Sequence, residues 1–418
     1  MFRQIVSPFV CILLSLVVCV LTFVGTTTYT SQKEEQRLNQ LRAEWSQYTK
    51  YNMFNNVSDE DLNNISKLLE LIKLHNQDSI RDFDNERVWE MIYKSLPLGT
   101  NDIYGQYYTE EEYAQTKESH AGNFVGIGVR IVYDEETHGA YVYGVITNSG
   151  AYTAGLQKGD IIIGVDDVLA TDETTYALML NKVLGEENSE VNVKVKRGDE
   201  ELDFTITRTQ VLSENVLYQK LEGDIAYIQI LTFSDSSVPY QFGQKMLLAQ
   251  EEGCKGYIFD VRNNTGGLLT SIIGVLDPML PEGPIINTID NQGVKQSEMS
   301  DATCFEAPMV VLCNKSTASA AELFTAALRD YEMATVVGET TYGKGSMQTT
   351  KLLSDGTAIK MSTALYTPPF SESYDGIGIK PDHEVQLSDE WKDKFYFMPQ
   401  EEDTQLNKAL EILNSAKN

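Results

Sequence analysis

Three short stretches in the C-terminal half of the chain contain residue types that can cleave acyl bonds. Ser319 follows the apolar run Met309–Cys313 and precedes an alanine-rich stretch, so we expect it at the N-terminus of a helix. At that position, free backbone N–H groups and the helix dipole favour the negative charge of a tetrahedral intermediate. A serine at a helix start is more often a plain N-cap, so Ser319 alone does not establish a nucleophile.

The second stretch supplies a candidate base. Lys344 stands between Gly343 and Gly345, 25 residues after Ser319. This spacing fits one helix and one strand, so a β-α-β crossover would return Lys344 to the strand end that carries Ser319. Burial in apolar surroundings would lower the lysine pKa by about three units and give the neutral amine that a base requires, with Gln348 placed to orient it. The alternatives for Lys344 are a solvated charge or a phosphate-binding lysine, but the glycines do not form a phosphate-loop pattern.

The third stretch contains paired glycines after a predicted strand that ends near Asp260. Without side chains, Gly266 or Gly267 can direct a backbone N–H at a neighbouring group. Either glycine is therefore a candidate oxyanion donor beside Ala320. A plain tight turn is the alternative.

Together, these stretches resemble the carboxyl-terminal processing peptidases, serine proteases that use a Ser-Lys dyad. The resemblance covers roughly residues 88 to 385 and includes the ordered motifs Asp260–Leu269, Asn314–Glu322, Gly338–Gln348 and Gly376–Asp382. It implies that Ser319 is the nucleophile, Lys344 the general base and Gln348 the residue that positions the lysine. It also implies that Gly266 and Gly267 contribute to the oxyanion hole.

The sequence departs from the family pattern at a few positions. Thr265 replaces a frequent proline, Ala321 a frequent serine, and Pro369-Phe370 a common serine-glycine pair. None of these changes removes a predicted catalytic group. They therefore affect the expected shape of the substrate-binding subsites and not the expected reaction. A histidine-based mechanism is the weaker alternative, with His383 as the candidate nearest to a motif.

Upstream of the catalytic motifs, residues 120 to 208 form short alternating runs rich in glycine, which predict a β-rich module. These residues resemble a PDZ domain, in which Gly126-Ile127-Gly128-Val129 stands for the carboxylate-binding loop. Such a loop and the adjoining strand edge would bind an apolar polypeptide C-terminus. The resemblance implies that the module gates the active site. The alternative is a wedge between domains that binds no ligand.

The patterns predict an α+β multidomain protein with a β-sheet crossed by helices in its catalytic core. The predicted parts are a membrane anchor or signal peptide (1–28), a helical region (29–118), a PDZ domain (119–209), a protease core (210–390) and a C-terminal helix (391–418). In the last part, Leu406, Leu410 and Leu413 share one helical face, which would dock on the body or on a second subunit. A homodimer is therefore one of the open alternatives.

The N-terminal segment predicts export. Ile5 to Val24 are twenty residues without a charge, long enough to span the roughly 30 Å core of a bilayer. Arg3 precedes them, and a weakly cleavable segment follows, which favours an uncleaved single-pass anchor over a cleaved signal. The catalytic part would lie outside the cytoplasm in either case, attached to the cell membrane or secreted.

Composition excludes several classes of function. With 33 basic and 61 acidic residues, the formal net charge is −28, so nucleic acid is not an expected partner. The four histidines are scattered and no C-x-x-C pair occurs, so we expect neither a metal nor a cofactor. Two function classes remain: a serine endopeptidase that cleaves near the C-terminus of exported polypeptides, and a non-catalytic scaffold or sensor of protein C-termini with an inactive protease body.

Overall fold

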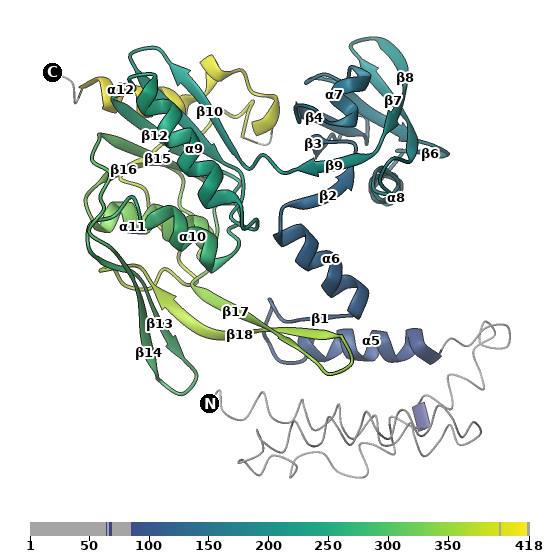
Figure 1. Cartoon of the computed structure of the whole chain (residues 1–418), viewed down its shortest axis with the longest axis horizontal. Coiled ribbons are helices and arrows are strands. Elements are labelled where there is room, and N and C mark those ends of the chain that lie inside the picture. Colours follow the sequence, from purple (N-terminus) through teal and green to yellow (C-terminus); the bar gives the residue numbers. More distant parts are fainter. Residues whose placement is uncertain (1–63, 65–66, 69–84, 393, 416–418) are drawn as a thin grey trace. The chain divides into compact units, whose positions relative to one another are not determined.

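The computed structural model describes residues 85–392 and 394–415, together with residues 64, 67 and 68 (Figure 1). The predicted N-terminal segment Ile5–Val24 lies outside this part of the chain. Within the described part, no helix is both long and apolar enough to cross a membrane.

The chain divides into two compact units. Of the described residues, the first unit contains those up to Thr116, Thr288–Gln296 and Ser346–Tyr366. The second contains those within Lys117–Asn287, Ser297–Gly345 and Thr367–Asn418. This division differs from the predicted domain boundaries, because it groups the PDZ region with most of the protease core. It also assigns residues 346–366 of the predicted core to the first unit.

The first unit combines helix with extended chain. Its elements are α5 (Asn85–Leu98), β1 (Gln106–Tyr108), the start of α6 (Glu110–His120), β17 (Ser346–Leu352) and most of β18 (Ala358–Thr367). Both β1 and β17 pair antiparallel with β18. Strand β1 lies within the region 29–118 that was predicted to be helical. The sequence did not reveal it, because the partner of this strand lies some 250 residues away and leaves no local pattern.

In the second unit, residues 123–212 form the β-rich module. Its main sheet has the order β3-β4-β5-β7-β8, with β6 beside β5, and β2 pairs separately with β9. The elements are β2 (Asn123–Gly126), β3 (Val129–Tyr133), β4 (Ala140–Val145), α7 (Gly150–Ala154), β5 (Ile161–Val165), β6 (Val168–Leu169), α8 (Glu173–Val183), β7 (Glu190–Arg197), β8 (Glu200–Thr207) and β9 (Thr209–Leu212). Their inward side chains, among them Ile127, Val142 and Met179, form one buried cluster.

The rest of the second unit is built on a six-stranded sheet with the order β10-β11-β12-β15-β16-β19. Its strands are β10 (Val216–Leu221), β11 (Ile225–Ile230), β12 (Gly256–Asp260), β15 (Met309–Cys313), β16 (Ala334–Gly338) and β19 (His383–Glu384). All neighbours except β10 and β11 are parallel. Every residue of β12 and β15 is buried, as expected for parallel strands covered on both faces. A hairpin of β13 (Gly283–Asp290) and β14 (Lys295–Ser300) precedes β15 in the sequence, and its tip, Thr288–Gln296, belongs to the first unit.

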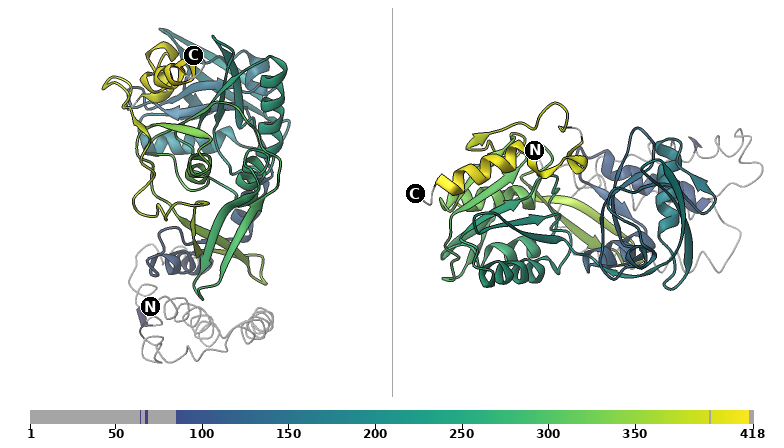
Figure 2. Two further views of the ribbon diagram at one scale, coloured as in Figure 1. Left: turned by 90° about the vertical axis from the view of Figure 1, so that its left-hand side faces the viewer. Right: turned by 90° about the horizontal axis from the view of Figure 1, so that it is seen from above.

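Helices cover both faces of this sheet (Figure 2). On one face are α9 (Val238–Glu251), α10 (Leu269–Leu276) and α11 (Ala320–Asp330), and Phe242 and Phe324 contact the ring of Phe259 from that side. On the other face is α12 (Thr404–Ser415), whose Leu406 and Leu413 pack into a cluster with alternate residues of the central strands. The apolar stripe predicted for the C-terminal helix therefore docks on the body of its own chain.

We expect truncation of the α12 stripe to destabilise the second unit. Leu406 is 2% exposed, so Leu406→Ala should lower the free energy of unfolding by about 2–4 kcal/mol through lost burial and a residual cavity. Leu247→Ala on α9 is a matched control, because Leu247 is 54% exposed and its truncation should cost about 0.5 kcal/mol or less. Urea denaturation of both variants measures the difference; equal losses would show that α12 does not contribute to the core.

Candidate active site

Ser319 lies at the junction of β15 and α11, and its backbone is strained. The fully buried strand β15 ends at Cys313, and α11 begins at Ala320. Ser319 has φ 56° and ψ −119°, whereas an ordinary N-cap residue is extended. A non-glycine residue in such a region costs about 1–3 kcal/mol and persists only where its surroundings hold it, as at the sharp strand-to-helix turns that carry nucleophilic serines. The conformation is therefore not that of a plain cap.

Glu322 joins the backbone of Ser319 to that of Lys344. The backbone N–H groups of both residues donate to Oε2 of Glu322, each over 2.8 Å. Oε1 accepts from the Gly343 N–H over 2.6 Å and from the Thr341 hydroxyl over 2.6 Å. The Glu322 side chain has no exposed surface, so these four donors take the place of water around its carboxylate.

The base loop (Gly338–Gly345) follows β16. This strand pairs parallel with β15, and Val336 of β16 lies opposite Val311 of β15. The β-α-β crossover predicted from the spacing of Ser319 and Lys344 is therefore present. Additional hydrogen bonds fix the loop: the Tyr342 N–H donates to the Thr317 carbonyl over 3.0 Å, and the Gly376 N–H donates to the Gly343 carbonyl over 2.8 Å. Lys344 itself is partly buried.

The glycine pair lies against Ser319. Gly266 has φ 96°, and a Cβ atom there would be 2.7 Å from the Ser319 Cβ and 2.9 Å from the Ala320 backbone nitrogen. The Gly266 N–H already donates to Oδ1 of Asn264 over 2.9 Å. Of the two predicted glycine donors, Gly267 is therefore the better candidate to act with Ala320, and the role of Gly266 is close packing.

Two asparagines connect the oxyanion turn (Val261–Gly267) to the turn before Ser319. The Asn263 N–H donates to Oδ1 of Asn314 over 3.0 Å, and Nδ2 of Asn314 donates to Oδ1 of Asn263 over 2.8 Å. The Ala318 N–H also donates to the Asn264 carbonyl over 2.9 Å. Asn263 has φ 61°, a conformation that asparagine tolerates better than most residues.

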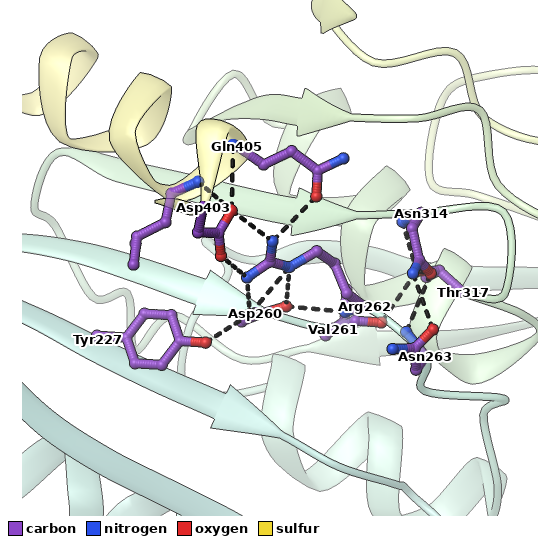
Figure 3. Close-up of polar contacts among 10 residues, drawn as sticks. Tyr227, Asp260, Val261, Arg262, Asn263, Asn314, Thr317, Asp403 and Gln405 are labelled. Carbon is purple, nitrogen blue, oxygen red and sulfur yellow. Dashed lines mark hydrogen bonds and ion pairs between the residues drawn. The ribbon is translucent and has the colours of Figure 1, made fainter. Parts of the chain in front are cut away.

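A buried ion cluster holds the start of the oxyanion turn (Figure 3). Arg262 donates from Nη2 to Oδ2 of Asp260 over 2.6 Å and to Oδ2 of Asp403 over 2.8 Å, and Nη1 donates to Oε1 of Gln405 over 2.9 Å. The Tyr227 hydroxyl donates to Oδ2 of Asp260 over 2.5 Å. Burial alone would lower the pKa of Arg262, but the two carboxylates outweigh it and raise that pKa well above its ordinary value. The residues just before α12 are thereby tied to the turn beside the nucleophile.

Gln348 is placed differently from the other predicted catalytic residues. It lies in β17 of the first unit, whereas Ser319 and Lys344 lie in the second. Its Nε2 donates to Oγ of Ser346 over 3.1 Å and to Oγ of Ser362 over 3.0 Å. These bonds fix the side-chain amide of Gln348. A contact between Gln348 and Lys344 stays a prediction.

The described residues give no support to the histidine alternative. His383 is exposed in the edge strand β19, paired with Val337. Among the described residues, no group of three or more histidine, cysteine, aspartate or glutamate side chains could hold a metal ion. Cys254, Cys304 and Cys313 are free thiols, and burial raises the pKa of Cys313 to about 12.

In the β-rich module, the predicted carboxylate-binding loop joins β2 to β3. Ile127 is buried, and its carbonyl accepts from the Ala151 N–H over 2.8 Å. Gly128 has φ 81°, and a Cβ atom there would be 2.1 Å from the Ser149 Cβ, so only glycine fits. Val129 begins β3, the first strand in the order of the main sheet. An edge strand next to a rigid loop is the arrangement that binds an extended peptide by strand addition.

Comparison with known proteins agrees with this architecture. The model of peptidase family S41 matches residues 224–385, and the PDZ domain model matches residues 125–207. A CtpA-like serine protease of Staphylococcus aureus strain N315 is 30% identical over 334 residues, which cover 78% of this chain and 66% of the relative. The carboxyl-terminal-processing protease of Synechocystis is 33% identical over 288 residues, 66% of each chain. The chain therefore spans just under two thirds of the length of these relatives.

The matches define the class of protein: a serine peptidase core with a PDZ domain. Residues 224–385 are a core of the peptidase family S41 type. Among solved structures, an S41 protease of Bacteroides fragilis shares the fold, with a TM-score of 0.52 and 17% identity over 70% of this chain and 84% of the other.

Several residues that build the site were not predicted from the sequence. Glu322 stands three residues after Ser319, the spacing of a capping box, and that pattern could have revealed its hydrogen bond to the Ser319 N–H. The pairing of Asn263 with Asn314 and of Arg262 with Asp403 joins residues far apart in the sequence, so no local signal marks them.

We expect neutralisation of Glu322 to destabilise the protein. Glu322→Gln turns an acceptor into an amide whose NH₂ group would face backbone N–H donors, so the free energy of unfolding should fall by about 2–3 kcal/mol. Glu332→Gln is a control for the same chemical change at an exposed position. Chemical denaturation of the two variants measures their free energies of unfolding. Equal values would contradict a structural role for the Glu322 carboxylate.

Proposed function

We propose that this protein is an exported serine endopeptidase that cleaves polypeptides near their C-terminus. One observation carries the proposal: the carboxylate of Glu322 accepts from the backbone N–H groups of both Ser319 and Lys344. A candidate nucleophile and a candidate base, 25 residues apart in sequence, are thereby held side by side, with the glycine turn packed against them.

The proposed reaction uses an acyl-enzyme. Neutral Lys344 accepts the hydroxyl proton of Ser319 while Oγ attacks the peptide carbonyl carbon, and backbone N–H groups of Gly267 and Ala320 stabilise the oxyanion. Collapse of this intermediate breaks the C–N bond, and the lysine gives its proton to the leaving amine. Water, deprotonated by the same lysine, then hydrolyses the ester and restores Ser319. Gln348 is proposed to orient the amine.

Substrate choice is assigned to the PDZ domain. The buried loop of Gly126, Ile127 and Gly128, followed by Val129 at the edge, supports the proposal that it binds the free carboxylate of an apolar polypeptide C-terminus. The uncharged stretch Ile5–Val24 supports export, with anchoring in the cell membrane favoured over secretion. A non-catalytic sensor of C-termini is the competing function.

Loss of either dyad residue should abolish cleavage. With an unfolded protein that carries an apolar C-terminus as substrate, Ser319→Ala and Lys344→Ala should each lower the cleavage rate by about a thousand-fold or more. Lys380→Ala removes an exposed lysine from a neighbouring motif and should cleave at the wild-type rate. Cleavage is followed by gel electrophoresis and mass spectrometry. If the wild-type protein leaves the substrate intact, the non-catalytic sensor of C-termini becomes the favoured function. If the Lys344→Ala variant is fully active, Lys344 is not the general base.

Amidation of the substrate's C-terminus tests the PDZ assignment separately. The amide lacks the charge that the loop N–H groups would bind, so KM should rise by about ten-fold or more while kcat changes little. The matched substrate has the same sequence with a free carboxylate. Equal KM values for the two substrates would show that the PDZ domain does not read the chain end.

A further inference from the structure

The role proposed for Gln348 requires one orientation of its side-chain amide. In the proposed reaction, the lone pair of the neutral Lys344 amine must face the hydroxyl of Ser319. Oε1 of Gln348 would hold that direction by accepting an N–H of the amine. An amide turned by 180° would instead offer its NH₂ group to the lone pair that the reaction needs. The orientation of this amide therefore determines whether Gln348 supports or blocks the base.

Two serines of the first unit contact the Gln348 amide. Nε2 donates to the backbone carbonyl of Ser346 over 3.2 Å, and a carbonyl can only accept. Nε2 also donates to Oγ of Ser362 over 3.0 Å, and Ser362 lies opposite Gln348 in the pairing of β17 with β18. A hydroxyl group can donate as well as accept, so Ser362 by itself would tolerate either orientation of the amide. Its contribution depends on where its own hydrogen points.

Asp102 determines the direction of the Ser362 hydroxyl. Oδ1 of Asp102 accepts from this hydroxyl over 2.8 Å, and Oδ2 accepts from the Ser362 backbone N–H over 2.6 Å. The Tyr104 N–H donates to Oδ1 as well, over 3.1 Å. A carboxylate has no hydrogen to donate, so the hydroxyl of Ser362 must donate to Asp102 and can only accept from Gln348.

The fold brings Asp102 to β18 from 260 residues away in the sequence. The Gly105 N–H donates to the Asp102 carbonyl over 2.9 Å and closes a turn, after which Gln106 of β1 lies opposite Lys360 of β18. Because this pairing is antiparallel, the residues before β1 lie near those that follow Lys360. Ser362 is exposed, so water competes for its hydroxyl and the expected effects are modest.

We propose that Asp102 is a positioning residue for Gln348 and that it acts through the hydroxyl of Ser362. The hydrogen bonds run in one direction, from Nε2 of Gln348 to Oγ of Ser362 and from there to Oδ1 of Asp102. The amide nitrogen is then held within the first unit, and Oε1 is the atom that accepts from the Lys344 amine. This inference rests on the proposed function, in which Gln348 orients the base.

Ser362→Ala tests the positioning role with little disturbance, because it keeps the backbone N–H that donates to Asp102. We expect kcat to fall about five-fold with KM unchanged, since the amide acts on the base and not on substrate binding. Asp102→Asn, which replaces one acceptor oxygen by an NH₂ group, should have a similar effect. Matched controls are Ser95→Ala on α5, at an exposed serine, and Asp389→Asn, at a fully exposed side chain; both should keep the wild-type kcat. Thermal melting establishes that each variant is folded.

A double-mutant cycle determines whether the effect passes through Gln348. Gln348→Ala alone should lower kcat by about ten-fold, since the base loses the group that orients it. In the Gln348→Ala background, Ser362→Ala and Asp102→Asn should cause no further loss. A further five-fold loss in that background, or wild-type kcat in both single variants, would overturn the positioning role.

Side-chain amide exchange tests the orientation without catalysis. In full-length Ser319→Ala protein labelled with ¹⁵N-glutamine, the NH₂ signals of Gln348 are identified by their loss on Gln348→Ala. Asp102→Asn and Ser362→Ala should each speed the exchange of these hydrogens with water by about ten-fold, because a protecting hydrogen bond is lost. Unchanged exchange in both variants would overturn the proposal. If the wild-type protein cleaves nothing, the proposed function fails, whereas this measurement still determines whether Asp102 positions Gln348.

Discussion

The candidate active site of this protein depends on one buried carboxylate. Glu322 has no access to water, so its two oxygen atoms require donors from the protein, and three of the four donors are backbone N–H groups. Backbone donors point in directions set by the chain, and they are available only if the base loop returns to the first turn of α11. The requirement to pair this charge therefore stabilises a strained Ser319 and fixes the approach of the loop that carries Lys344.

Buried polar groups also fix the backbone on the other side of Ser319. The apolar core holds the strands and helices together, but hydrophobic contacts are not directional, and an oxyanion hole needs N–H groups aimed at one point. Hydrogen bonds supply that direction: Asn263 pairs with Asn314, and Arg262 is enclosed by Asp260 and Asp403. Removal of one partner from such a buried ion cluster is costly, typically about 3–5 kcal/mol, which makes the turn rigid.

The sequence predicted those parts of the site that leave a local pattern. The sequence pattern predicted the strands β12 and β15 and a helix start at Ser319, and the 25-residue spacing predicted the parallel crossover that brings Lys344 back. Contacts between distant segments were not predictable in this way. Strand β1 pairs with β18, and Asp403 reaches Arg262 from 141 residues away, because both depend on the tertiary arrangement. For Gly266, the paired glycines indicated a close backbone approach, but only the structure distinguishes a packing role from a donor role.

The C-terminal part of the second unit contributes residues that hold the candidate site. Helix α12 packs on the sheet through Leu406 and Leu413, which is ordinary core stabilisation, but the residues just before it contact Arg262. Apolar packing of α12 therefore also sets the position of Asp403 and Gln405 beside the oxyanion turn. Since Tyr396 and Phe397 stack on β4 at the same time, one segment contacts both the turn beside the nucleophile and the domain proposed to recognise the substrate.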